Sequence, residues 1–241
     1  MTPPRHRPRR GLPALLAAID PSTGPAQAGI LAELRRAVVA GAVPPGASLP
    51  VDALAGHFGV SPIPIRETLK TLQGEGLVAH EPGHGYVVAQ LTLAEYTELY
   101  IARGALEQAA LGRAVGVATA ADLDGLRGLH AALGEALERG DYVAWHRISR
   151  DFHEALVRPC AMQRLLQLLT ATWNTTQPVP SMTLIDPEHV GMLHAEHAQM
   201  LEHFAAGAAP ALLEVAAAHH AHLIDEIASL PAGHALFADP A

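Results

Sequence analysis

Histidine is the residue type in this sequence with the greatest potential for chemistry. The chain has 15 histidines among 241 residues, against 16 Lys+Arg and a single Cys160. A neutral imidazole binds transition metals, and a titrating imidazole moves protons near neutral pH. The stretch 148–156, ISRDFHEAL, places His153 inside a helical pattern. A lone histidine of this kind is more often a packed residue than a ligand, so its role depends on its surroundings.

Two further histidines lie on apolar faces of expected helices. His197 shares its face with Met200 and Phe204, and His222 aligns with Val215. Both are expected to point inward, which suits a packed residue as well as a ligand. Four others are expected at solvated positions or around such a site: His194, His203, His219 and His220.

The sequence lacks the motifs that are typical of hydrolases. There is no H-E-x-x-H, no G-x-S-x-G and no glycine-rich phosphate loop, and HAEH at 194–197 lacks the spacing of a metalloprotease motif. We therefore expect a protein that is not an enzyme. Metal-assisted hydrolysis stays only as the weakest alternative.

Composition favours a folded helical protein in a reducing compartment. The chain is 49% hydrophobic and only 4% aromatic, so Leu, Ala and Val must fill the core. One cysteine excludes an internal disulfide framework and favours the cytoplasm. No apolar run approaches the roughly 20 residues of a membrane helix, so no membrane partner is expected.

Charge divides the chain into two unequal parts. Residues 1–90 carry a net charge of +2, whereas residues 91–241 carry −10. A polyanion is therefore expected to bind the first third of the chain.

The first third shows the pattern of a winged helix-turn-helix. A flexible, basic, proline-rich arm is expected over 1–24, and the DNA-binding domain over 25–90. Its helices are expected within 28–43, 51–60 and 61–76, and the last of these has Ser61 as a plausible N-cap and Pro62 at the first helical position. Two β-prone runs around Pro-Gly-His-Gly then predict a hairpin.

The stretch PPGASLPVDALAGHFGVSPIPIRETLKTLQGEGLVAHEPGHGYVVA closely resembles the winged helix of GntR-family transcriptional regulators. PPG, LAGHFGVS, PIRETL, EGLV and the wing glycine carry the resemblance, which covers about 65 residues. It implies that the helix beginning at Ser61 enters the major groove of a DNA operator.

The expected contacts on that helix follow from its side chains. The N–H groups at its N-terminus, beginning at Ser61, are expected to bind a phosphate. Arg66 is expected to contact a guanine, and Lys70 is expected to contact a phosphate. Relatives often have Arg and Thr after the serine, where this chain has Pro62 and Ile63. Ile63 would either contact the methyl group of a thymine or serve only in packing within the protein. The alternative for Arg66 is an ion pair, for which two carboxylates are available: Glu67 and Glu33.

The wing offers a second expected contact with DNA. Gly85 allows the backbone to approach the minor groove closely, and His84 is placed to enter it.

From Leu91 onward the pattern is helical throughout. Six amphipathic stretches predict an antiparallel all-α bundle over 91–230, followed by a tail over 231–241. The complete chain is thus expected to be mainly α. The six helices are expected within 92–115, 119–140, 141–159, 161–176, 188–207 and 210–230.

The helical half resembles the FCD domain, the all-α effector-binding domain of the FadR-like GntR subgroup. YIARGALEQAA, DFHEAL, EHAQMLEHFAAGAAPAL and HHAHLIDEI carry the resemblance. It implies a divalent metal held by three histidines and one Asp or Asn. Carried over, the ligands are His153, His197 and His222, with Ser149 in the acid position, one turn before His153.

Ser149 departs from the pattern of the family. Asp151 cannot replace the acid because it lies about 200° around the helix, and His146 lies about 10 Å along the axis. Three imidazoles still suit Zn or a Ni-like metal, with water or a ligand carboxylate completing the shell. A metal-free bundle that serves only as a dimerisation scaffold remains open.

The resemblance also implies an effector site on the first helix of the bundle. Relatives use an arginine near the effector at the position of Arg103, which lies one turn from Glu107. Arg103 could hold a small carboxylate against the metal. A surface ion pair with Glu107 is the alternative.

Together these features predict a homodimeric DNA-binding regulator, more often a repressor in such families. A palindromic operator and a small carboxylate effector are the expected partners. The effector would bind two arrangements of the winged helices unequally.

Overall fold

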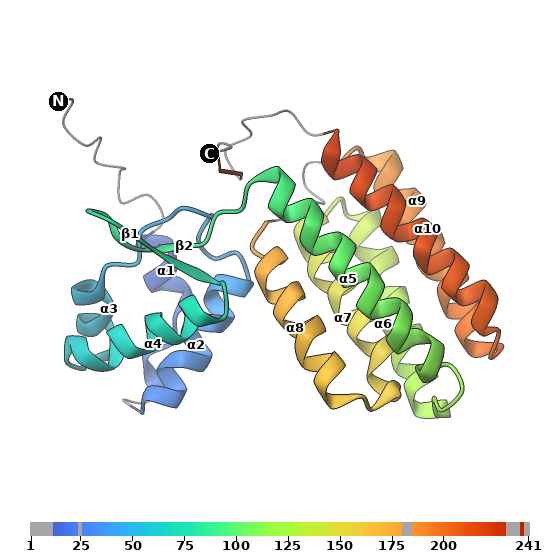
Figure 1. Ribbon diagram of the computed structural model, residues 1–241, viewed down its shortest axis with the longest axis horizontal. Helices are drawn as coiled ribbons and strands as arrows, with labels where there is room; N and C mark the ends of the chain where they lie inside the picture. Colours follow the sequence, from blue (N-terminus) through green and yellow to red (C-terminus); the bar gives the residue numbers. More distant parts are fainter. Residues whose placement is uncertain (1–11, 24–25, 180–184, 230–236, 239–241) are drawn as a thin grey trace. The chain divides into compact units, whose positions relative to one another are not determined.

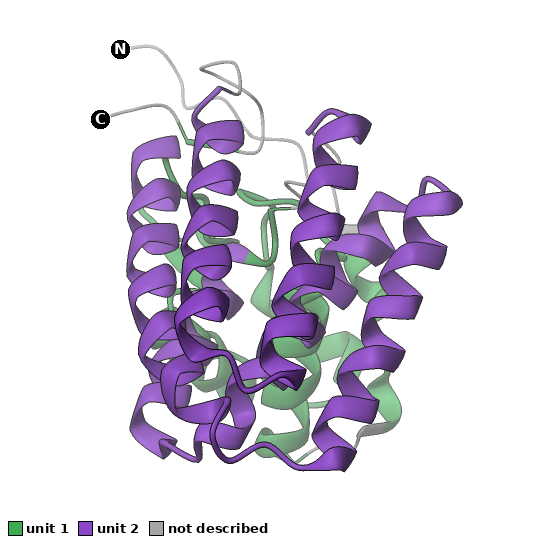
Figure 2. Cartoon of the chain, turned by 90° about the vertical axis from the view of Figure 1, so that its right-hand side faces the viewer, with its two compact units in different colours: residues 1–92, 177–179, 235–241 green, residues 93–176, 180–234 purple. Residues whose placement is uncertain are grey.

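A computed structural model describes residues 12–23, 26–179, 185–229 and 237–238. These residues form α-helices and one antiparallel two-stranded sheet, which confirms the predicted mainly α class (Figure 1). The chain divides into two compact units (Figure 2). The first unit runs to Thr92 and also takes in 177–179, while Leu93 begins the second.

The first unit has the three helices and the hairpin of a winged helix-turn-helix. Helix α4 packs against both α2 and α3, and it also contacts strand β1. Leu34, Leu54 and Leu69 are almost fully buried at the centre of this core. The elements are α2 (Gln27–Val39), α3 (Val51–Phe58), α4 (Pro62–Gly74), β1 (Val78–Glu81) and β2 (Gly85–Val88).

The wing is a short antiparallel hairpin. Val78 pairs with Val88 at its base, and Glu81 pairs with Gly85 at its tip. The segment before α3 adds to the edge, because Leu49 donates its backbone N–H to the carbonyl of Tyr86 at 2.8 Å. Gly83 and Gly85 adopt φ angles of +78° and +77°, so the turn requires the left-handed region that glycine tolerates.

The N-terminal segment differs from the predicted flexible arm over 1–24. The structure contains helix α1 (Leu12–Ala18) and the 3-10 turn η1 (Pro21–Thr23) there. Leu15 and Ile19 lie in the same core as α2, α3 and α4. Because prolines and arginines dominate this segment, its composition hid the apolar spacing of Leu15 and Ile19. Residues 1–11 of the arm lie outside the described residues.

Polar bonds hold α1 in place as well. Arg36 donates to the carbonyl of Ala18 at 2.5 Å, and the backbone N–H of Asp20 donates to Glu33 at 2.7 Å. The first domain therefore begins no later than Leu12 in this structure.

The second unit is a helical bundle, as predicted. Helix α5 packs on α10, α8 and α7, while α6 packs on α7 and α9. The helices are α5 (Leu93–Ala114), α6 (Ala120–Glu138), α7 (Tyr142–Val157), α8 (Gln163–Thr176), α9 (Pro187–Ala205) and α10 (Ala209–Ala228), with a 3-10 turn η2 (Arg158–Cys160). The predicted tail over 231–241 lies largely outside the described residues.

Local sequence signals set the ends of these helices. Thr119 and Asp122 form a reciprocal capping box at the start of α6. Asp141 accepts a hydrogen bond from the backbone N–H of Ala144 and so caps α7, directly after Gly140 with its φ of +66°. Among the described residues, no helix is long and apolar enough to cross a membrane.

Candidate functional site

Helix α4 presents a polar face from its first turns. Ser61 has the extended backbone of an N-cap, and Pro62 follows at the first helical position. Ile65 and Leu69 are fully buried, so they fix the rotation of the helix against α2 and α3. As a result, Arg66 and Lys70 lie on the exposed side.

Arg66 is free of the ion pairs that were its alternative. Glu67 instead binds Lys70 at 3.0 Å, and Glu33 binds Arg36 at 2.6 Å. No hydrogen bond or ion pair joins Arg66 to any residue in the described part of the chain. An exposed guanidinium without a partner keeps all of its donors available for a guanine or a phosphate.

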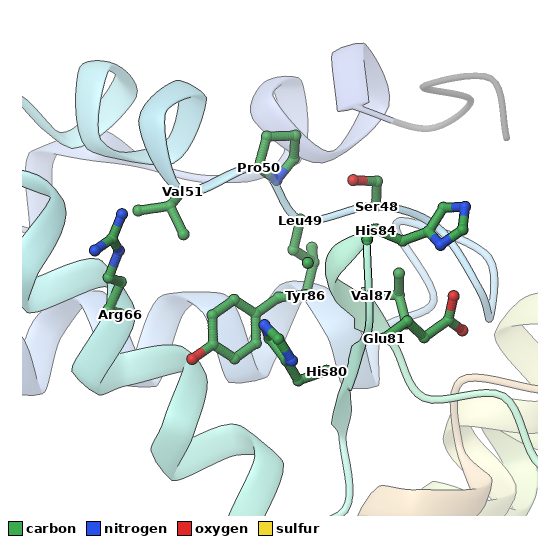
Figure 3. Close-up of a pocket in the computed structure, with 12 residues that line it drawn as sticks. Ser48, Leu49, Pro50, Val51, Arg66, His80, Glu81, His84, Tyr86 and Val87 are labelled. Carbon is green, nitrogen blue, oxygen red and sulfur yellow. The ribbon is translucent and has the colours of Figure 1, made fainter. Parts of the chain in front are cut away.

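Arg66 and the wing line one shallow pocket of about 560 Å³ (Figure 3). In this view Arg66 lies on one side, His84 lies on the other, and Tyr86 lies between them. His84 is exposed, whereas Gly85 is half-buried. The pocket thus joins the two elements that were predicted to contact DNA.

In the second unit, three buried histidines from three helices converge. His153 of α7, His197 of α9 and His219 of α10 each offer one ring nitrogen, and these nitrogens lie within 4.8 Å of one another. The Nε2 atoms of His153 and His197 are 3.2 Å apart. The exposed fractions of these residues are 2%, 0% and 2%, so the cluster is closed to bulk water.

Two carboxylates orient two of these rings. Glu107 accepts a hydrogen bond from Nδ1 of His153 at 3.1 Å, and Glu196 accepts one from Nδ1 of His219 at 2.8 Å. A protonated Nδ1 leaves a lone pair on Nε2 in a neutral imidazole. Both rings therefore aim a lone pair at the cluster, in the carboxylate–histidine arrangement that is typical of metal sites.

Packing orients the third ring. Trp145 stacks on His197 with ring centroids 5.4 Å apart, and Phe152 packs at 4.9 Å. Nδ1 of His197 has no hydrogen-bond partner among the described residues. The donor set thus fits a divalent cation held by one ring nitrogen of each histidine. Without a cation, Nε2 of either His153 or His197 must carry a proton that it donates to the other.

Burial keeps all three imidazoles neutral. It lowers the pKa of His153, and it lowers the pKa of His197 well below the usual value of 6.5, with help from neighbouring histidines. Burial also lowers the pKa of His219 to about 4, although Glu196 opposes the shift. Metal binding requires the neutral form, so the cluster is ready for a cation at pH 7.

Glu107 is the centre of a buried polar network beside the histidines. It accepts hydrogen bonds from Nε of Arg103 at 2.7 Å, from Trp173 at 3.1 Å and from His220 at 3.0 Å, besides that from His153. Burial raises the pKa of Glu107, but Arg103, His153 and His220 together outweigh burial, and the net pKa lies well below the usual range. Glu107 is therefore an anion at neutral pH.

Comparison with known proteins assigns both units. Residues 26–88 match the bacterial regulatory proteins of the gntR family, and residues 98–223, more than half of the chain, match the FCD domain. This chain belongs to the GntR family. It is a DNA-binding transcriptional regulator with an FCD domain.

Individual relatives agree with this assignment. The chain is 33% identical over 133 residues to an uncharacterized HTH-type transcriptional regulator of Agrobacterium vitis, covering 54% of this chain and 77% of that protein. It is 31% identical over 153 residues to the gluconate operon transcriptional repressor of Bacillus licheniformis, covering 62% and 60%. The fold is also that of Escherichia coli McbR/YncC, with a TM-score of 0.74 at 23% identity over 84% of this chain and 96% of that chain.

One predicted ligand of this GntR-family regulator, His222, does not lie in the histidine cluster. His222 lies outside the cluster, with a side chain that is 45% exposed and Nδ1 2.5 Å from Glu196. His219 takes its place. The two residues are three positions apart, so they differ by only about 60° in direction but by about 4.5 Å along the helix. The position of the histidine along the axis of α10, rather than the face of the helix on which it lies, therefore determines which ring reaches the cluster.

The structure also describes the other residues that were predicted to line the metal and effector site. Ser149 is half-buried, one turn before His153 on α7. The Arg103–Glu107 pair exists, but it is buried rather than on the surface, with side chains 9% and 1% exposed. Residue type and spacing did not identify Glu196 or Trp173 as members of the site, whereas His220 was expected at a solvated position or around it. The only available signal for Glu196 was its position next to His197.

Proposed function

We propose that this GntR-family regulator is a homodimeric repressor that binds a palindromic operator in the cytoplasm and releases it when a small carboxylate binds in the bundle. The name of the gluconate operon repressor, a relative over most of this chain, supports repression. Net charge supports the assignment of DNA to the first unit. The effector would favour one arrangement of the two winged helices and so change operator affinity.

On the DNA side, Arg66 is the residue that reads sequence. Ser61 and Lys70 contact phosphates, while His84 and Gly85 lie at the minor groove. Lys70 must give up its bond to Glu67, but an exposed ion pair of this kind contributes little to stability because water screens it. A phosphate therefore replaces it at little cost.

In the bundle, the observation that carries the proposal is the convergence of three histidine ring nitrogens in the buried cluster. His153, His197 and His219 would hold a divalent cation of the Zn or Ni type, which prefers imidazole ligands. Three protein ligands leave a coordination position open. A bound cation would supply a Lewis-acidic centre there for a carboxylate oxygen.

Arg103 would bind the rest of the effector. Its Nε is occupied by Glu107, but neither Nη atom is hydrogen-bonded to a described residue. Its guanidinium also lies 4.9 Å above the Tyr100 ring, which holds its plane. A fixed guanidinium with free terminal donors matches a planar carboxylate.

Restoring an acid at position 149 tests the metal site. Ser149→Asp should raise affinity for Zn or Ni by about tenfold or more, because an anion then lies one turn before His153 and opposite charges attract strongly in a buried site. Isothermal titration of untagged, metal-stripped protein measures this change. Ser149→Asn is the matched control, since it adds a neutral oxygen and should change affinity less.

The same titration separates the proposal from a metal-free scaffold. Parent protein that ignores Zn and Ni, together with a Ser149→Asp variant that also ignores them, would leave the bundle as a dimerisation domain without a metal.

A further inference from the structure

The first turn of α4 has an unusual apolar tip. Ile63 is 71% exposed, the highest fraction among the large apolar side chains in the described part of the chain that are exposed. Ile65, two positions later, is completely buried. Ile63 is thus separate from the core and is available to a partner outside this chain.

The backbone of this turn offers few polar contacts. Two of the first three helical positions are Pro62 and Pro64, which have no N–H. Only Ile63 retains a donor there. Recognition at this tip must therefore come mainly from side-chain shape, and a β-branched residue in a helix holds essentially one rotamer. Because the χ1 angle of Ile63 is already restricted, a contact costs little additional side-chain entropy.

The neighbouring charge indicates what the tip meets. Arg66 lies three residues after Ile63, on the same side of the helix, and has no partner among the described residues. A surface that combines a free guanidinium with an apolar group matches the edges of bases in the major groove. Thymine is the one base that presents a methyl group there, and guanine presents the two acceptors that arginine binds.

We propose that Ile63 determines operator specificity by packing on a thymine methyl group close to the guanine that Arg66 reads. This inference rests on the proposed operator binding and adds one element of the sequence that is read. Each half-site must then contain a thymine whose C5-methyl contributes to affinity.

The test uses operator DNA obtained by selection from random duplexes with the parent protein. Each thymine of the selected half-site is replaced in turn by deoxyuridine, which removes only the methyl group. Burial of one methyl is worth about 0.8 kcal/mol, so one such replacement should weaken parent binding by about fourfold. Ile63→Ala should bind thymine and uracil duplexes equally at that position.

Controls keep the result specific. Gln73→Ala changes an exposed residue in the last turn of α4 and should retain the full difference between thymine and uracil. Thermal unfolding should be the same for Ile63→Ala and the parent, because the side chain is outside the core.

Three results would overturn the inference: a selected half-site without thymine, no uracil effect in the parent, or an undiminished uracil effect in Ile63→Ala. Each is distinguishable from failure of the proposed function. If operator binding itself is wrong, selection yields no enriched sequence, which overturns both.

Discussion

Replacing Arg66 with alanine is expected to abolish specific operator binding while the fold stays intact. A bidentate arginine–guanine contact is worth about 1–3 kcal/mol, and a symmetric dimer would lose two of them. Operator affinity should therefore fall by a factor of about 30 or more, towards the affinity for unrelated DNA. Gel-shift titrations on operator and scrambled duplexes at one fixed salt concentration measure the change.

The structure makes this variant a clean test. Arg66 is exposed and has no partner in the described residues, so its loss should leave the thermal unfolding midpoint nearly unchanged. Arg66→Lys keeps the charge but loses the planar fork, so it should recover affinity without recovering specificity. Lys70→Ala should weaken binding to all sequences alike. Equal operator affinity for Arg66→Ala and the parent would remove Arg66 from recognition.

The second large effect is expected at the histidine cluster. His219→Ala should eliminate stoichiometric metal from protein purified without a histidine tag, because it removes one of the three proposed protein ligands. His222→Ala should keep about one metal per chain. The two histidines lie on the same helix, and both contact Glu196. Comparing the two variants therefore separates the loss of a metal ligand from the loss of a contact with Glu196. Elemental analysis gives the metal content directly.

A loss of structure must be separated from a loss of ligand. His219→Asn keeps a polar group of similar size, and unfolding of the metal-stripped proteins reports how much stability each change removes. Metal lost in His222→Ala but kept in His219→Ala would restore the ligand set that the resemblance to the FCD domain implied.

The winged helix was predictable because its signals are local. Ser61, Pro62 and the glycines of the wing each require one backbone geometry, and these geometries follow in a fixed order. Helix α1 was missed because its buried residue Leu15, and Ile19 directly after the helix, follow a run of prolines and arginines. The burial of Leu15 and Ile19 depends on packing against α2 and α3, which a local sequence pattern does not reveal.

The bundle shows where sequence reasoning reaches its limit. Periodicity predicted that His197 and His222 point inward, but it could not separate His219 from His222 on nearly the same face of α10, and the ligand set came from the resemblance to the FCD domain. Periodicity also left Arg103 and Glu107 as a possible surface pair. Their burial results from α5 packing on α7, α8 and α10 together, which brings Trp173 and His220 onto the same carboxylate.

We propose that a ligand at the histidine cluster controls the DNA-binding unit. The direct measurement is operator affinity of metal-loaded protein against a panel of small carboxylic acids, with metal-stripped protein and His219→Ala in parallel. We expect at least one acid to weaken operator binding by roughly 5- to 150-fold in the metal-loaded parent, and to have little effect in the other two. An acid that weakens binding equally in all three proteins would contradict the claim.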